Sequence, residues 1–130
     1  NLFASTASRE RKFWGFLLFQ KLLAIAQTFS VVISSIFSPN LMRCLINQSQ
    51  VKDRFLNRAA EKSIKTIINI TQSNPGLLPK ILSQLIGGHG TYQFDKVTKT
   101  KTVSQLLDLI TEDNYEGTIT VLEKIANDIQ

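Results

Sequence analysis

The chain has 130 residues, of which 43% are hydrophobic and 19% are charged, and its formal net charge is +5 at pH 7. This length suits one domain with a single core, and the composition excludes a globally disordered chain. The single cysteine, Cys44, excludes an internal disulfide and a cysteine-based metal site, and its apolar surroundings predict a small buried side chain. We expect residues 1–130 to be one helical segment of a longer protein.

The charge is unevenly distributed along the chain. Residues 8–107 carry 14 lysines and arginines against four acidic residues, whereas residues 108–130 carry one lysine against six acidic residues. A basic body (8–107) followed by an acidic C-terminal end (108–130) indicates either a polyanion partner or docking of the two parts on each other.

The first predicted helix, Ser8–Gln27, is apolar around almost its whole circumference. Lys21 marks its only clearly polar strip, a pattern typical of a central core helix or a membrane span. The stretch Leu22–Met42 contains no charge, but its many polar residues favour a buried helix over a membrane span. A short helix is expected next, at Ser30–Phe37.

Two consecutive helices, Ser38–Ser49 and Val51–Ser73, organise the middle of the chain. Ser38 is expected to cap the first, with Pro39 at its first helical position. The second separates into two faces at about 100° per residue. Its apolar face, predicted to pack on Ser8–Gln27, comprises Phe55, Leu56, Ala59, Ala60, Ile64, Ile67 and Ile70, and its opposite face carries a basic stripe of Arg54, Arg58, Lys62 and Lys65.

The second half of the chain predicts shorter elements. A helix at Leu77–Ile86 is followed by Gly87–Lys101, a predicted loop of about fifteen residues, which is long for a compact domain and therefore functional or flexible. Further helices are expected from Thr102 onward and at Asp113–Gln130, the latter with an apolar face. That face comprises Ile119, Leu122, Ile125, Ala126 and Ile129.

The fold class follows from the periodicity of these segments. Because no alternating period-two stretch competes with the helices, we expect an all-α fold of about six helices. Antiparallel helix pairs of this length are typical of a HEAT- or armadillo-like α-solenoid, which we prefer to an irregular bundle.

The sequence shows no catalytic motif. His89 is flanked by glycines without a nearby base or metal partner, and it is expected to be a surface residue of the loop. Asp95 has no second acid near it in sequence, although two-metal phosphoryl transfer needs carboxylates presented together. The run Gly87–Gly90 ends a helix and is not followed by Lys-Ser/Thr, so it is not a phosphate-binding P-loop. We predict no catalytic residue, no metal site and no cofactor.

Two surfaces are candidates for binding a polyanion. One is the basic stripe, and the other is the loop segment 92–102, which contains Lys96, Lys99 and Lys101 among threonines, Tyr92 and Phe94. Lysine amines bind phosphates, threonine hydroxyls bond phosphate or sugar oxygens, and an exposed aromatic ring stacks on an unpaired base. We consider the loop lysines the stronger candidates, for contact with RNA or with an acidic protein surface.

Each of these surfaces also has a structural explanation. The basic stripe would then be the solvated face of a core helix. Phe94 would anchor the loop to the core, and Asp95 would cap or bridge locally.

Four segments together resemble one known family. They are Ser8–Leu17, Phe37–Ser49, Arg54–Arg58 and Gly88–Lys99, with Thr102 and Val103 beyond the last. In this order and spacing, over residues 8–107, they resemble the fungal DNA polymerase V proteins of the DNA polymerase phi / Myb-binding protein 1a family.

The resemblance implies a nucleolar factor built of HEAT/armadillo-like helices, acting in ribosomal RNA production and in assembly of the large (pre-60S) ribosomal subunit. It implies pre-ribosomal RNA and ribosomal or assembly-factor proteins as partners, with ribosomal DNA as a further candidate, and neither a membrane nor a small-molecule substrate. The family name implies a polymerase, but this stretch has no polymerase carboxylate pattern, no nucleotide-binding loop and no strand framework.

We therefore expect a non-catalytic scaffold or RNA-binding segment in the nucleus and nucleolus. The alternative is a protein-interaction solenoid without nucleic-acid contact. In that case the basic stripe would pair with an acidic partner or with residues 108–130 of the chain itself.

Overall fold

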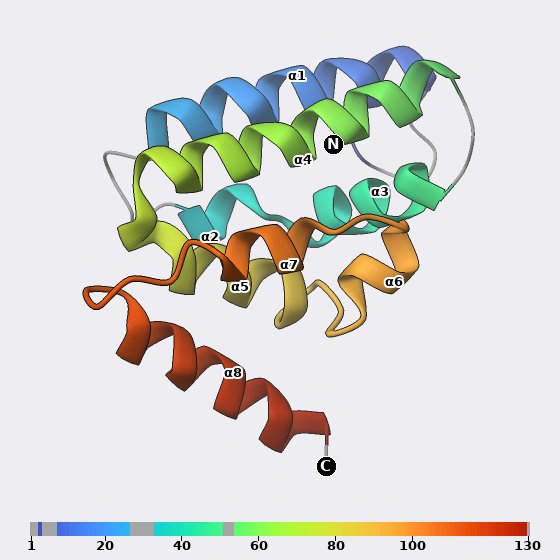
Figure 1. The fold of residues 1–130 in the computed structure, drawn as a ribbon. Helices are drawn as coiled ribbons and strands as arrows, with labels where there is room; N and C mark the ends of the chain where they lie inside the picture. The colour runs from blue at the N-terminus through green and yellow to red at the C-terminus, as the bar shows by residue number, and fades with distance from the viewer. Residues whose placement is uncertain (1–2, 4–7, 27–32, 51–53, 130) are drawn as a thin grey trace.

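The computed structural model describes residues 3, 8–26, 33–50 and 54–129 (Figure 1). In these ranges the chain is all-α, as predicted, with eight α-helices and one 3-10 turn at Pro75–Leu77 and without a β-strand. The helices are α1 (Arg9–Ala26), α2 (Ile33–Ile36), α3 (Pro39–Gln50), α4 (Arg54–Ser73), α5 (Leu78–Ile86), α6 (Phe94–Thr98), α7 (Thr102–Leu107) and α8 (Tyr115–Ile129). The expected number of about six was too low.

The two long helices α1 and α4 lie side by side and run in the same direction (Figure 1). The predicted packing of the apolar face of α4 is confirmed, because its described members are all buried: Leu56, Ala59, Ala60, Ile64, Ile67 and Ile70. Gln20 on α1 donates a hydrogen bond from Nε2 to Ser63 Oγ on α4 at 3.0 Å. Each fully buried aliphatic side chain contributes roughly 1.5–3 kcal/mol, so this face holds α4 in place.

The prediction that α1 is a central core helix was wrong. Phe16, Phe19 and Leu23 are buried, but a second apolar stripe is exposed on the outer side of the helix. That stripe comprises Trp14 (61% exposed), Leu18 (47%), Leu22 (41%) and Ile25 (64%). All-round apolarity predicts burial on all sides, whereas in the described part of the chain α1 lies at the edge of the fold. In the described ranges, no helix combines the length and apolarity needed to cross a membrane.

Helices α2, α3 and α5 form a second layer beneath α1 and α4, and α3 runs back in the opposite direction to α4 (Figure 1). Ser38 caps α3 as predicted, because its Oγ accepts a hydrogen bond from the Leu41 N–H at 3.1 Å. Cys44 on α3 is buried as predicted, and its Sγ donates to the carbonyl oxygen of Phe3 at 3.3 Å. Burial raises the pKa of the Cys44 thiol, since the apolar surroundings disfavour the thiolate.

Helix α8 packs against α5, on the far side of the second layer from α1 and α4 (Figure 1). Helix α8 therefore lies away from the exposed face of α4, and among the described residues no ion pair joins the acidic end to Arg58, Lys62 or Lys65. The apolar face predicted for α8 is only partly covered. Ile119, Leu122 and Ile125 are half-buried, whereas Ala126 and Ile129 are exposed.

The segment 87–101, predicted as a loop of about fifteen residues, contains helix α6. Gly87 and Gly88 end α5 as predicted, and Gly88 has a positive φ of 51°. A Cβ at Gly90 would overlap the carbonyl oxygen of Leu85, so the backbone approach here admits only glycine. His89 in this turn is exposed, as expected.

Candidate nucleic-acid interface

Phe94 fixes the start of α6 to the core. Its side chain is completely buried, which confirms the anchoring role and removes the ring as a platform for a base. Thr98 Oγ1 donates a hydrogen bond to the Phe94 carbonyl oxygen at 2.7 Å. The side chain of the last residue of α6 is therefore bonded to the backbone of the first. Tyr92 is 55% exposed, but it borders a separate hollow between the end of α5 and α8.

Asp95 caps helix α7. Its Oδ1 accepts the Val103 N–H at 2.8 Å and its Oδ2 accepts the Ser104 N–H at 3.1 Å. These are two of the amide groups that the first turn of a helix leaves without partners, and such a cap is worth about 1–2 kcal/mol. Both carboxylate oxygens thus have a structural role, as the capping explanation predicted.

The turn between α6 and α7 is fixed by an unusual backbone and a chain of hydroxyl groups. Lys99 has φ 60° and ψ 41°, the left-handed conformation, and its N–H bonds the Asp95 carbonyl oxygen. For a residue with a Cβ this conformation costs about 1–2 kcal/mol. The Thr100 hydroxyl lies 2.8 Å from both Thr98 Oγ1 and Thr102 Oγ1, so three threonines brace the turn.

This turn faces α4 across a groove of about 420 Å³. The groove is bounded by the end of α3, one side of α4 and the segment from α6 to α7. Its lining residues are Ser49, Gln50, Asn57, Glu61, Ile64, Lys65, Ile68, Thr98, Lys99, Thr100, Lys101, Thr102 and Gln105. The two surfaces that the sequence offered separately, the basic stripe and the loop, therefore meet here through Lys65, Lys99 and Lys101, which we name the groove lysines.

The groove is positively charged. Among the described residues that line it, Glu61 is the one carboxylate, and its Oε1 lies 3.6 Å from Lys65 Nζ. Both side chains of this pair are well exposed, at 70% for Lys65 and 58% for Glu61, so water screens the interaction and Lys65 remains able to exchange partners. Lys99 and Lys101 form no ion pair with a carboxylate of the described residues.

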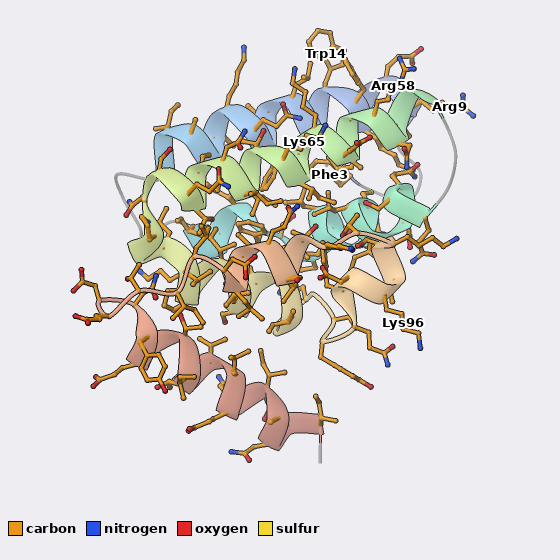
Figure 2. All side chains as sticks on the ribbon, in the orientation of Figure 1. Phe3, Arg9, Trp14, Arg58, Lys65 and Lys96 are labelled. Atoms are coloured by element: carbon orange, nitrogen blue, oxygen red, sulfur yellow. The ribbon has the colours of Figure 1, made fainter. Side chains whose placement is uncertain are left out.

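The other predicted residues lie outside the groove. Arg58 and Lys62 are exposed on the outer side of α4, and we name them the outer cations. Lys96 is exposed and projects from α6 on the side away from α4, the helix that carries Lys65 (Figure 2). Arg54 begins α4, but its side chain lies outside the described residues.

Sequence reasoning missed the polar and apolar residues between the lysines. Asn57, Glu61, Ile64 and Ile68 follow one another along α4 at helical spacing, on the border between its apolar face and its basic stripe. Asn57 also ties α3 to α4, because its Nδ2 donates to the Gln48 carbonyl oxygen at 2.9 Å. The sequence signal that could have identified them is this mixed row of polar and apolar residues next to the basic stripe. In the part of the chain that is described, His, Cys, Asp and Glu side chains form no group that could hold a metal ion.

Comparison with known proteins gives consistent matches. The family profile described as DNA polymerase phi matches residues 1–130. The rDNA transcriptional regulator pol5 of Schizosaccharomyces pombe is 41% identical over 111 residues, which are 85% of this chain and 11% of that protein. The rDNA transcriptional regulator POL5 of Saccharomyces cerevisiae is 37% identical over 109 residues, 82% of this chain and 10% of that protein. The chain thus spans about a tenth of the length of these relatives, and no solved structure matches it.

Proposed function

The chain belongs to the DNA polymerase phi family, and from that membership we propose that it is a non-catalytic, RNA-binding scaffold segment of a nuclear and nucleolar factor. The factor would act in ribosomal RNA production and in assembly of the large ribosomal subunit. Two relatives are named as rDNA transcriptional regulators, which supports a role at ribosomal DNA and its transcripts. The observation that carries RNA binding is the groove that gathers Lys65, Lys99 and Lys101.

The arrangement of the helices supports a scaffold of the HEAT or armadillo type. In such a solenoid the first helices of successive repeats stack in one layer and the second helices stack in another. Here α4 contacts α1 on one side and α7 on the other, while α5 contacts α2 and α8. On this basis we propose that α1, α4 and α7 form one layer of the solenoid and that α2, α5 and α8 form the other.

We propose no catalytic role for this segment, despite the polymerase in the family name. Asp95, the acidic residue within the lysine-rich segment, caps α7 with both of its oxygens. Metal-dependent nucleotide incorporation that is abolished by Asp95→Asn, in a variant that remains folded, would overturn this proposal.

Salt dependence and charge reversal test the RNA-binding proposal. Three phosphate contacts on a single strand give a slope of about −2 in log affinity against log salt, or about a 20-fold loss between 50 and 200 mM. Lys99→Glu with Lys101→Glu should weaken binding of the 130-residue chain to pre-ribosomal RNA by more than about 10-fold at 50 mM salt. The matched control, Arg58→Glu with Lys62→Glu, makes the same charge change on the outer cations and should cost less than about threefold. Affinity that is flat with salt, or equal losses in both double variants, would contradict the groove as the contact.

A protein-interaction solenoid without RNA contact is the second candidate function. The observation that favours it is the exposure of Arg58 and Lys62 on the outer side of α4, outside the groove, where an acidic protein surface could pair with them. Crosslinking in a purified pre-ribosome separates the two functions. Crosslinks from Arg58, Lys62 and Lys65 to protein alone would favour this second function over the first.

A further inference from the structure

The groove combines three kinds of surface in a small volume. Its inner side is apolar, from the buried Ile64 and the half-buried Ile68. Amide and hydroxyl groups line its sides, from Ser49, Gln50, Asn57, Thr100 and Gln105. The groove lysines supply the positive charge (Figure 2 labels Lys65). A bare phosphate needs only the last of these, whereas a nucleotide uses all three, since it has an apolar ring face, polar ring edges and a charged backbone.

The size of the groove favours an unpaired nucleotide. A volume of about 420 Å³ lies in the range of sites that hold one small organic group. An RNA duplex keeps its bases stacked inside and presents phosphates and 2′-hydroxyls to a protein. An unpaired base can turn outward into a pocket, so the apolar inner side of this groove is accessible to single-stranded RNA.

Lys99 supplies an independent observation. Its left-handed backbone is the conformation that glycine or asparagine adopts at lowest cost at the end of a helix. Glycine would therefore form this turn at a lower conformational cost than lysine. The stability of the turn does not explain why the residue has a lysine side chain. An outlier of this kind points to a role for the side chain. Here the side chain lines the groove, and no carboxylate of the described residues pairs with it.

We propose that the groove is a binding site for one unpaired nucleotide of an RNA strand. The base lies against Ile64 and Ile68, the side-chain amides of Gln50 and Gln105 contact its edge and the ribose, and Lys99 and Lys101 bind the flanking phosphates. The bracing of the turn by its threonine hydroxyls places both lysines before the RNA arrives, which lowers the entropy cost of binding. This proposal rests on the proposed function in one respect, which is that the polyanion bound by the groove is RNA.

Four variants of the 130-residue chain test the site by fluorescence anisotropy. The probes are a single-stranded oligoribonucleotide, the same strand in a duplex, and polyglutamate as an acidic polypeptide. Lys99→Gly should keep or raise the melting temperature, because it relieves the left-handed backbone, while weakening single-strand binding about 3- to 10-fold and reducing the salt slope by about 0.7. Lys101→Ala should weaken it to a similar extent. Ile68→Thr should weaken it about threefold with an unchanged salt slope. Lys96→Ala, in the same segment but outside the groove, is the control and should change binding less than about twofold.

The outcomes separate this site from the general function. A preference for the single strand that Lys99→Gly and Ile68→Thr both reduce supports the nucleotide site. Equal binding of strand and duplex, with Ile68→Thr indistinguishable from the unmodified chain, overturns the site but leaves the proposed RNA-binding function intact. Absence of RNA binding by the unmodified chain overturns both. Tighter binding of polyglutamate than of RNA, weakened by Lys99→Gly, would make the groove a protein site and overturn the inference.

Discussion

Two of the walls of the groove, which face each other, are built by different means. One wall is a side of α4, a regular 20-residue helix whose groove residues recur at helical spacing. The other is formed by the short helices α6 and α7, of five and six residues, and the turn between them. A long amphipathic helix spreads its stabilisation over many buried side chains, whereas the second wall depends on a few specific contacts. A single substitution at one of these contacts should therefore destabilise the second wall, whereas substitutions of the exposed residues of α4 should have little effect on the first.

The largest effect is expected at the anchor of the second wall. Phe94→Ala removes a fully buried ring and should lower the free energy of unfolding by about 3–5 kcal/mol. Urea denaturation followed by circular dichroism measures the change. Tyr92→Ala, which truncates an exposed aromatic two residues earlier, is the matched control and should change it by less than about 0.5 kcal/mol. Equal losses in the two variants would show that Phe94 does not anchor this wall.

A smaller effect is expected from the cap of α7. Asp95→Ala removes the acceptors of the Val103 and Ser104 N–H groups and should cost about 1–2 kcal/mol in the same measurement. The affinity for single-stranded RNA should fall as well, because the loss of the cap loosens the position of Lys101. Asp108→Ala, at an exposed residue just after α7, serves as the control. If the two substitutions destabilise the chain equally, the cap contributes little to the second wall.

The smallest effect is expected on the exposed side of α4. Arg58→Ala with Lys62→Ala replaces two exposed residues by the best helix former, so the free energy of unfolding should change by less than about 0.5 kcal/mol. Binding to single-stranded RNA should weaken less than about twofold, since neither side chain lines the groove. A tenfold loss of affinity in this variant would move the contact from the groove to the outer cations.

The same difference between the walls explains what the sequence could predict. The periodicity of α4 predicted its apolar face and its exposed stripe. The Ser38 cap could be predicted from the sequence because a cap depends on residues that are close together in the chain. A five-residue helix such as α6 is too short to show a period, so Phe94 and Asp95 were read within a loop. Their roles depend on partners in the core and in α7.

Two further features depend on tertiary placement. Periodicity showed that α1 is apolar all round, but only the structure shows that Trp14 and Ile25 are exposed. The groove joins residues 49–50, 57–68 and 98–105, which are separated along the chain. The seven candidate cations were found from their charge and from their place on a helix face or in a loop, and neither could separate the groove lysines from the outer cations or from Lys96.

Photocrosslinking of the 130-residue chain to a single-stranded RNA that carries 4-thiouridine, with the crosslinked peptides identified by mass spectrometry, tests the central claim most directly. The groove predicts crosslinks in the peptides that contain Lys99 and Lys101 and in the part of α4 around Lys65 and Ile68, and these should disappear in the Lys99→Glu, Lys101→Glu variant. Crosslinks confined to the peptides that carry Arg58 or Lys96, or crosslinks that persist unchanged in the double variant, would contradict the groove as the RNA-binding site.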